Sequence, residues 1–370
     1  MFKKMLLTLS ALTLLVAGAA NAGDANWTFY GVGHVSINSL NNGTDSQLGV
    51  TSNTSRFGFK GTSEINADLT AFWQFETKID MVKHEPGTDV DYDDPFVPFE
   101  LANRNTFVGF KHATAGKFMV GRHDTPFKAL GRKVEVFPDQ MGDFRAMTLG
   151  WDNRLGEIAA WVSPDWNGFS LFAAYMFDQG TPGDEEKSTA MSASAAYATE
   201  QFLIGGAYEA ESKGWYGTDD APHAMRFVAK YMGAQFDLNG LYQTSSNEFG
   251  YQDWKTSTMG VGATFKMNDK WNLKGQMAIA NWNTDAEDDT ETSDIDESDT
   301  KSTNMTFGVE RVFTQNVLAY AQFSMMNDGD NSAFDIGGDQ SGFGASVGGT
   351  NDGGEWQSPS GISLGTVVTW

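Results

Sequence analysis

One acidic run carries the residue types that bind metal ions. Residues 285–299 hold nine carboxylates in fifteen positions, and hard divalent cations bind oxygen-rich sites of this kind. The run lacks the glycine and the fixed spacing of an EF-hand loop. We therefore interpret it first as a solvated, self-repelling loop. The candidate cation ligands, if it does bind a metal, are Asp285, Glu287, Asp288 and Asp289.

Other chemically reactive residues are sparse. Cysteine is absent, which excludes thiolate catalysis and cysteine-based metal sites. The five histidines form no i, i+4 pair and no His-Glu-x-x-His motif. A hydrolase could be built only around a pair such as His123–Asp124 with a nearby Ser or Thr, and this is the less favoured alternative. We expect no enzyme and no cofactor.

The charge of the chain points to a class of partner. The sequence has 25 Lys and Arg against 48 Asp and Glu, a formal net charge of −23. Such acidity would repel the phosphates of nucleic acid. It favours cations, attracted either into a pore or to a cation-bridged lipid surface.

The two ends of the chain indicate export to a membrane. Lys3 and Lys4 precede an apolar run, and Ala20-Asn21-Ala22 supplies a small-x-small cleavage site. We expect a signal peptide at 1–22, cleaved after Ala22, and one mature domain at 23–370. The last strand alternates in polarity and ends in an aromatic, Trp370, which is typical of the closing strand of an outer-membrane barrel. Trp370 is thus the expected insertion signal for the barrel-assembly machinery.

Period-two alternation dominates the rest of the chain. Segments of about ten residues alternate and are separated by polar turns, the pattern of transmembrane strands. No stretch of the mature chain is apolar for long enough to form a membrane helix. Short and long connections alternate, and an even strand count leaves no open edge. We predict an all-β, 16-stranded antiparallel transmembrane barrel with long extracellular loops. Its strands are 26–38, 52–65, 67–81, 102–113, 116–123, 148–162, 167–178, 188–199, 200–213, 222–233, 234–245, 254–267, 270–283, 302–314, 315–327 and 359–370.

Several motifs resemble the general trimeric porins of Gram-negative outer membranes. They are Phe29-Tyr-Gly31, Ser55-Arg-Phe-Gly-Phe-Lys-Gly61, Asn103-Arg-Asn-Thr-Phe-Val-Gly109, Gly116-Lys-Phe-Met-Val-Gly-Arg122 and Trp161-Val-Ser-Pro-Asp-Trp-Asn-Gly168. The resemblance implies a homotrimer in lipopolysaccharide-containing membrane that passes small hydrophilic solutes. The loop at 82–101 matches in position the loop by which such porins latch onto a neighbouring subunit; a plain surface loop is the alternative.

The resemblance also implies a site. In these porins the third loop folds into the barrel, and its acidic residues face arginines of the wall. Here that loop is 124–147, and Glu135-Val-Phe-Pro-Asp-Gln-Met-Gly-Asp143 matches its acidic tip. The implied acidic side of the constriction is therefore Glu135, Asp139 and Asp143. The implied basic side is Arg56, Arg104 and Arg122, with Arg154 and Lys128 as further candidates.

Opposite charges across a narrow pore set up a transverse field that orients water and polar solutes. The alternative is that these are ordinary lumen charges in a wider barrel. We expect a diffusion porin with mild cation preference. A substrate-selective channel, for example for oligosaccharides, and a barrel that carries an adhesin or receptor are the competing hypotheses.

Overall fold

The computed structural model describes residues 26–43, 45–82, 104–148, 150–178, 187–215, 220–248, 254–284, 301–327 and 358–370. The predicted signal peptide, most of the latch-like loop and the acidic run at 285–299 lie outside these residues.

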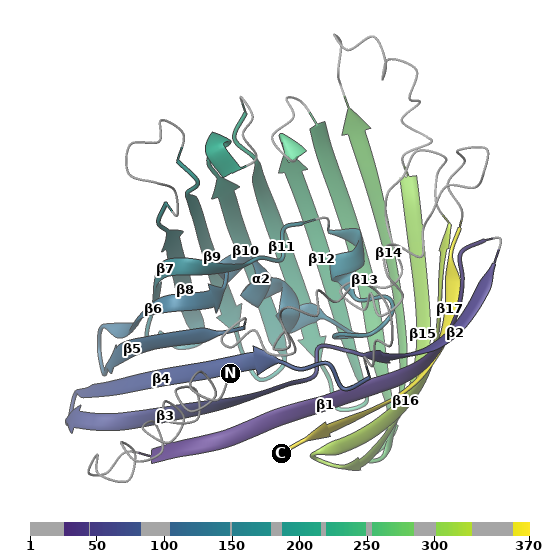
Figure 1. The fold of residues 1–370 in the computed structure, drawn as a ribbon, viewed down its shortest axis with the longest axis horizontal. Coiled ribbons are helices and arrows are strands. Elements are labelled where there is room, and N and C mark those ends of the chain that lie inside the picture. The colour runs from purple at the N-terminus through teal and green to yellow at the C-terminus, as the bar shows by residue number, and fades with distance from the viewer. Residues whose placement is uncertain are drawn as a thin grey trace, which may run out of the picture.

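Antiparallel strands form one closed barrel (Figure 1). β1 pairs on one side with β17 and on the other with β2 and β3, which closes the sheet on itself. The strands are β1 (Asn26–Asn41), β2 (Ser46–Ser52), β3 (Arg56–Asn66), β4 (Leu69–Lys78), β5 (Thr106–His112), β6 (Gly116–Asp124), β7 (Arg154–Val162), β8 (Phe169–Met176), β9 (Ala190–Ala198), β10 (Phe202–Glu211), β11 (His223–Met232), β12 (Phe236–Ser246), β13 (Trp254–Asn268), β14 (Trp271–Thr284), β15 (Lys301–Thr314), β16 (Val317–Asn327) and β17 (Ser360–Thr369).

The predicted sixteen strands are confirmed, and the two largest differences from the predicted bounds are in the sixth strand, predicted at 148–162, where β7 begins at Arg154, and in the second. β2 and β3 pair with successive halves of β1, so together they form a single barrel strand. That strand begins at Ser46, six residues earlier than the sequence predicts. It is interrupted at residues 53–55, where Thr54 has a positive φ of 54°. This left-handed conformation cannot continue a β ladder, which explains the break.

Side-chain alternation turns one face of each strand outward. On β11, the outward Met225 and Phe227 are 46% and 57% exposed, whereas the inward Arg226 and Val228 are 1% and 4% exposed. An apolar outer surface suits the hydrocarbon of a bilayer, and alternate residues are left to line the interior. Within the described residues, no helix combines the length and the apolar character that a membrane span requires.

The closing seam joins the two ends of the barrel, as predicted. β1 pairs with β17 from Val32↔Thr369 to Asn41↔Ser360. The backbones of Gly31 and Trp370 exchange two hydrogen bonds of 3.1 and 3.2 Å. A Cβ on Gly31 would collide with the indole of Trp370, so the terminal ring lies flat against the first strand because that position is glycine.

The segment between β6 and β7 lies inside the barrel (Figure 1). It contains α2 (Pro126–Gly131) and the short 3-10 helices η1 (Arg132–Val134) and η2 (Phe144–Met147). Thr125 caps α2 by accepting a hydrogen bond from the Lys128 amide, and Pro126 occupies its first turn. Phe127 and Leu130 of α2 are almost fully buried and belong to one apolar cluster with β10 and β11 residues such as Leu203 and Val228.

Candidate channel constriction

The inward-folded loop, residues 125–153, is anchored along one side by polar residues of the barrel wall. Their side chains donate hydrogen bonds to backbone carbonyl groups of the loop, which satisfies acceptors that burial would otherwise leave unpaired. All five donors stand on inward positions of β12, β13, β14 and β16. The bonds run from Asn239 to Val134 (2.9 Å), Gln243 to Thr148 (2.9 Å), Thr258 to Met147 (2.5 Å), Gln322 to Met141 (3.4 Å) and Gln276 to Gly142.

The tip of the loop touches the wall closely because it contains a glycine. Gly142 has a φ of +76°, and a Cβ there would collide with the Thr306 side chain on β15. Two residues on, the Phe144 ring lies over Gly260 of β13, where any side chain would clash with it. Small residues on both surfaces thus allow the backbone of the tip to approach the wall.

A buried ion pair fixes the root of the loop. The Arg226 side chain on β11 is 1% exposed, and its Nη1 lies 2.8 Å from Asp152 Oδ1. The same guanidinium lies 4.2 Å from the centre of the Phe127 ring of α2. Although burial opposes ionisation, Arg226 lowers the pKa of Asp152 below its usual value. Removing either partner would leave an uncompensated buried charge.

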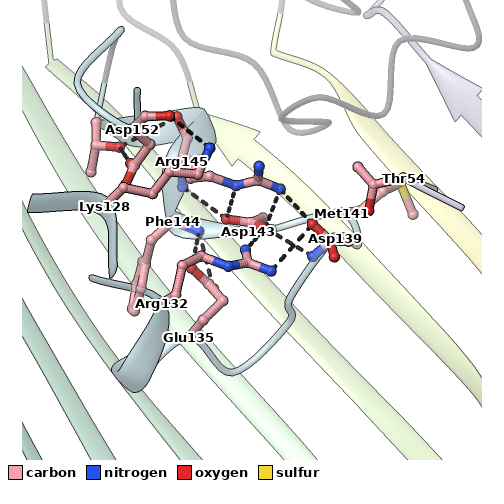
Figure 2. Close-up of polar contacts among 12 residues, drawn as sticks. Thr54, Lys128, Arg132, Glu135, Asp139, Met141, Asp143, Phe144, Arg145 and Asp152 are labelled. Carbon is pink, nitrogen blue, oxygen red and sulfur yellow. Dashed lines mark hydrogen bonds and ion pairs between the residues drawn. The ribbon is translucent and has the colours of Figure 1, made fainter. Parts of the chain in front are cut away.

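The acidic tip is neutralised by arginines of the same loop (Figure 2). Asp143, whose side chain is fully buried, lies 2.9 Å from Arg132 and 2.8 Å from Arg145. Asp139 lies 3.2 Å and 2.9 Å from the same two guanidiniums. Burial disfavours ionisation of Asp143, but the two arginines outweigh it and hold its pKa well below the usual range. Both carboxylates are therefore ionised at neutral pH, and their charge is largely compensated within the loop.

Glu135 bonds to the backbone of its own loop and not to the barrel wall. Its carboxyl oxygens accept hydrogen bonds of 3.1 and 3.2 Å from the backbone N–H of Phe144, which ties η1 to η2 (Figure 2). Burial, followed by the neighbouring charge of Asp143, raises the pKa of Glu135 well above its ordinary value. The structure does not bring Glu135 into contact with a wall arginine.

One wall arginine, Arg56, reaches the tip, and a second, Arg104, is linked to it through Glu76. Arg56 Nη1 lies 3.7 Å from Asp139 Oδ2, and Arg56 Nε lies 3.9 Å from Glu76 on β4. Glu76 also forms a 2.6 Å ion pair with Arg104. The chain of charges Asp139–Arg56–Glu76–Arg104 therefore links the loop to β3 and β4. The side chains of Arg56 and Arg132 are 23% and 27% exposed, the most accessible in this group.

A second set of charges surrounds the entry of the loop. Asp124 lies 2.9 Å from Arg154 and 3.4 Å from Lys128, and the Lys128 ammonium also donates to the Asp152 carbonyl. Arg122 stands apart from this set. It shares the alternation of Phe118 and Val120, which are 52% and 55% exposed on the outer face, so its side chain leaves β6 on the side opposite His123.

Several residues of this site were not among those inferred from sequence. Glu76 and Arg226 carry buried ion pairs, and Arg132 and Arg145 neutralise the tip. The sequence does indicate that Arg226 faces inward. It is a charged residue between the inward Ala224 and Val228 on an alternating strand. Thr125–Pro126 likewise marks a helix start. No comparable signal shows that loop arginines fold back onto their own loop.

The described residues contain no group of three His, Asp or Glu side chains placed to hold a metal ion. The candidate ligands in the acidic run at 285–299 fall outside those residues.

Comparison with known proteins places this architecture in a family. The model of the Gram-negative porin family matches residues 8–331. Outer membrane porin F of Escherichia coli strain 536 is 30% identical over 260 residues, which are 65% of this chain and 68% of the relative.

Solved structures share the fold. An anion-selective porin from Comamonas acidovorans superposes with a TM-score of 0.72 at 19% identity, over 94% of this chain and 100% of that one. OmpT of Vibrio cholerae, in a structure described as its trimer form, gives a TM-score of 0.62 at 16% identity, over 94% and 99% of the two chains. The chain therefore belongs to the Gram-negative porin family and is an outer-membrane porin channel.

Proposed function

We propose that this chain is a general diffusion porin, exported by a signal peptide cleaved after Ala22 and assembled as a homotrimer among lipopolysaccharide and other outer-membrane lipids. Small hydrophilic solutes and ions would cross it passively. The observation that carries this proposal is the loop at 125–153, held inside the barrel with its charged edge toward Arg56. OmpT of Vibrio cholerae, a structural neighbour, forms a trimer, which supports the oligomeric part of the proposal.

The narrowest part of the pore would lie beside the Asp139–Arg56 contact. Carboxylates and guanidiniums there are fixed by ion pairs, so their dipoles are already oriented when a solute arrives. A field of this kind orders water, and an apolar solute must displace that water to pass. Polar solutes exchange one set of hydrogen bonds for another, so passage depends on size and charge.

Ion preference follows from where the charges lie. Of the 25 basic and 48 acidic side chains, 22 basic and 21 acidic ones belong to the described residues. The barrel and its inner loop are thus nearly neutral, and the negative charge of the chain belongs to the remaining segments, which include the acidic run at 285–299. We propose that those segments supply the mild cation preference.

The test is the reversal potential of the purified native protein in a planar bilayer under a tenfold KCl gradient. Screening lengths are about 30 Å at about 0.01 M salt and about 3 Å at about 1 M. We expect cation preference at low salt that declines toward zero at high salt, and a smaller low-salt preference after deletion of residues 285–299. A barrel that does not conduct, or a preference that salt and the deletion leave unchanged, would refute the proposal.

A further inference from the structure

Four rings from four different strands meet on the inner face of the wall. They are Phe72 of β4, Phe107 of β5, His123 of β6 and Phe172 of β8, and we call them the aromatic cluster. Ring centres lie 5.9 Å apart for Phe72 and Phe107, 5.1 Å for Phe107 and His123, and 5.7 Å for His123 and Phe172. These separations are those of interacting aromatic pairs.

The aromatic cluster covers an apolar layer and remains partly open itself. Met119, Ile158 and Met176 beneath it are 6%, 3% and 2% exposed, and the three phenylalanines pack against them while staying half-buried. The interior of a porin is generally polar. Half-exposed rings gathered on one part of that interior therefore form a surface suited to an apolar solute face.

His123 adds one polar group to this surface. Its Nδ1 lies 2.6 Å from the backbone oxygen of Asp124. A carbonyl oxygen can only accept, so Nδ1 carries the proton and, in the neutral ring, Nε2 is a hydrogen-bond acceptor. Among the described residues, none forms a hydrogen bond with Nε2. It can therefore accept a bond from a hydroxyl or amino group of a solute that lies on the rings.

The charges next to the aromatic cluster have an excess of positive sign. Arg154 and Lys128 flank Asp124, which directly follows His123. Arg56 and Arg104 flank Glu76, which stands on β4 with Phe72. With Asp139, which Arg56 also contacts, these four cationic side chains share three carboxylates. A solute with a carboxylate group complements this surrounding better than one with an ammonium group.

We infer that the aromatic cluster is a binding subsite for solutes that join a flat aromatic ring to a carboxylate. The ring stacks on the phenylalanines, a ring hydroxyl donates to His123 Nε2, and the carboxylate faces the arginines. This inference rests on the proposed diffusion function and narrows it. Solutes of this class are retained near the constriction, whereas other small solutes of the same size diffuse through without binding.

The probe is 4-hydroxybenzoate, and the readouts are independent. Titration calorimetry on the detergent-solubilised oligomer measures binding, and planar bilayers measure block of the KCl current. We expect saturable binding and brief current blocks with 4-hydroxybenzoate, and at least tenfold weaker effects with acetate and with benzylamine, an aromatic cation. The double variant Phe107→Leu and Phe172→Leu keeps apolar volume, and should weaken binding about tenfold with KCl conductance nearly unchanged.

A matched control is Phe227→Leu, which alters an outward phenylalanine of β11 and should leave binding unchanged. If the double variant does not fold, His123→Phe serves instead, and we expect it to abolish the advantage of 4-hydroxybenzoate over benzoate. Equal binding to wild type and variants, or equal affinity for benzylamine, would overturn the inference. A wild-type protein that does not conduct KCl would refute the diffusion proposal. Calorimetry would still show whether the aromatic cluster binds 4-hydroxybenzoate.

Discussion

Different interactions attach the two sides of the inner loop to the barrel wall. The side toward β9–β16 is buried: α2 packs on apolar wall residues, wall amides bind loop carbonyls, and Arg226 is paired with Asp152. The side toward β1–β6 meets the wall mainly through charges, of which Arg56 and Asp139 are 3.7 Å apart. One side fixes the loop in the barrel, and we propose that the other forms the edge of the channel.

This difference shows that local ion pairs neutralise many of the charges, so the net charge of a segment does not predict the field that it produces. The resemblance to porins implies an acidic loop opposite a basic wall. In the structure each side carries both signs, because Arg132 and Arg145 neutralise the tip and Glu76 neutralises part of the wall. We therefore propose that the field across the channel comes from the few groups that remain accessible, chiefly Arg56 and Arg132.

Substituting the buried arginine on the attached side should have the largest effect. Arg226→Leu leaves the Asp152 carboxylate buried and unpaired, which costs about 3–5 kcal/mol. We expect the root of the loop to detach while the barrel persists, seen as a larger and noisier open-channel current with unchanged strand content. The same substitution at Arg311, which lies on the outer rim against Trp271, is the control and should leave the current unchanged.

The next effect should come from the core of the tip. Asp143→Asn removes the charge that holds both Arg132 and Arg145, and hydrogen bonds to charged groups contribute about 1.5–3 kcal/mol each. Arg132 and Arg145 would then share only Asp139 as an ionic partner. We expect frequent current fluctuations in single-channel records. Asp68→Asn, in an exposed turn, should behave as wild type, and a quiet Asp143→Asn channel would contradict this assignment.

A pH effect should distinguish Glu135 from its neighbours. Because its pKa is raised by burial and by Asp143, protonated Glu135 stabilises the loop fully below the ordinary carboxyl pKa of about 4.3. That stabilisation is lost as pH rises through the raised pKa, where ionisation sets two carboxylates against each other. Current noise should therefore increase with pH in the wild type, and Glu135→Gln should remove the increase. Equal pH profiles would show that Glu135 does not titrate within the loop.

The smallest effect belongs to the open side. Arg56→Gln removes one accessible positive charge from a hydrated site. In water, two unit charges at close range interact with an energy of about 1 kcal/mol. The cation-to-anion permeability ratio should rise roughly twofold at unchanged conductance noise. Lys60→Gln, four residues farther along β3, should shift the ratio less. A shift in the opposite direction would mean that Arg56 does not face the permeating ions.

Sequence predicts the barrel better than the loop, for a physical reason. Strand alternation is local, so the positions of the strands follow from period two, and the closing role of Trp370 was predicted from the terminal aromatic of the last strand. The resemblance to porins implied that Arg56 and Asp139 belong to one site, but not that they lie 3.7 Å apart. The pairing of Arg132 with Asp143 and of Arg226 with Asp152 depends on the path of the loop through the barrel. Neither spacing nor alternation encodes that path.

We propose that the tip presents Asp139 to the channel and Met141 to the wall. Met141 is 2% exposed and lies against Gly361, whereas the Asp139 side chain is 14% exposed. The chain has no cysteine, so Asp139→Cys and Met141→Cys each carry one thiol. Reaction with a charged methanethiosulfonate during current recording should reduce the conductance of the Asp139→Cys channel and leave the conductance of the Met141→Cys channel unchanged. Equal reaction at both positions, or reaction only at residue 141, would contradict this orientation of the tip.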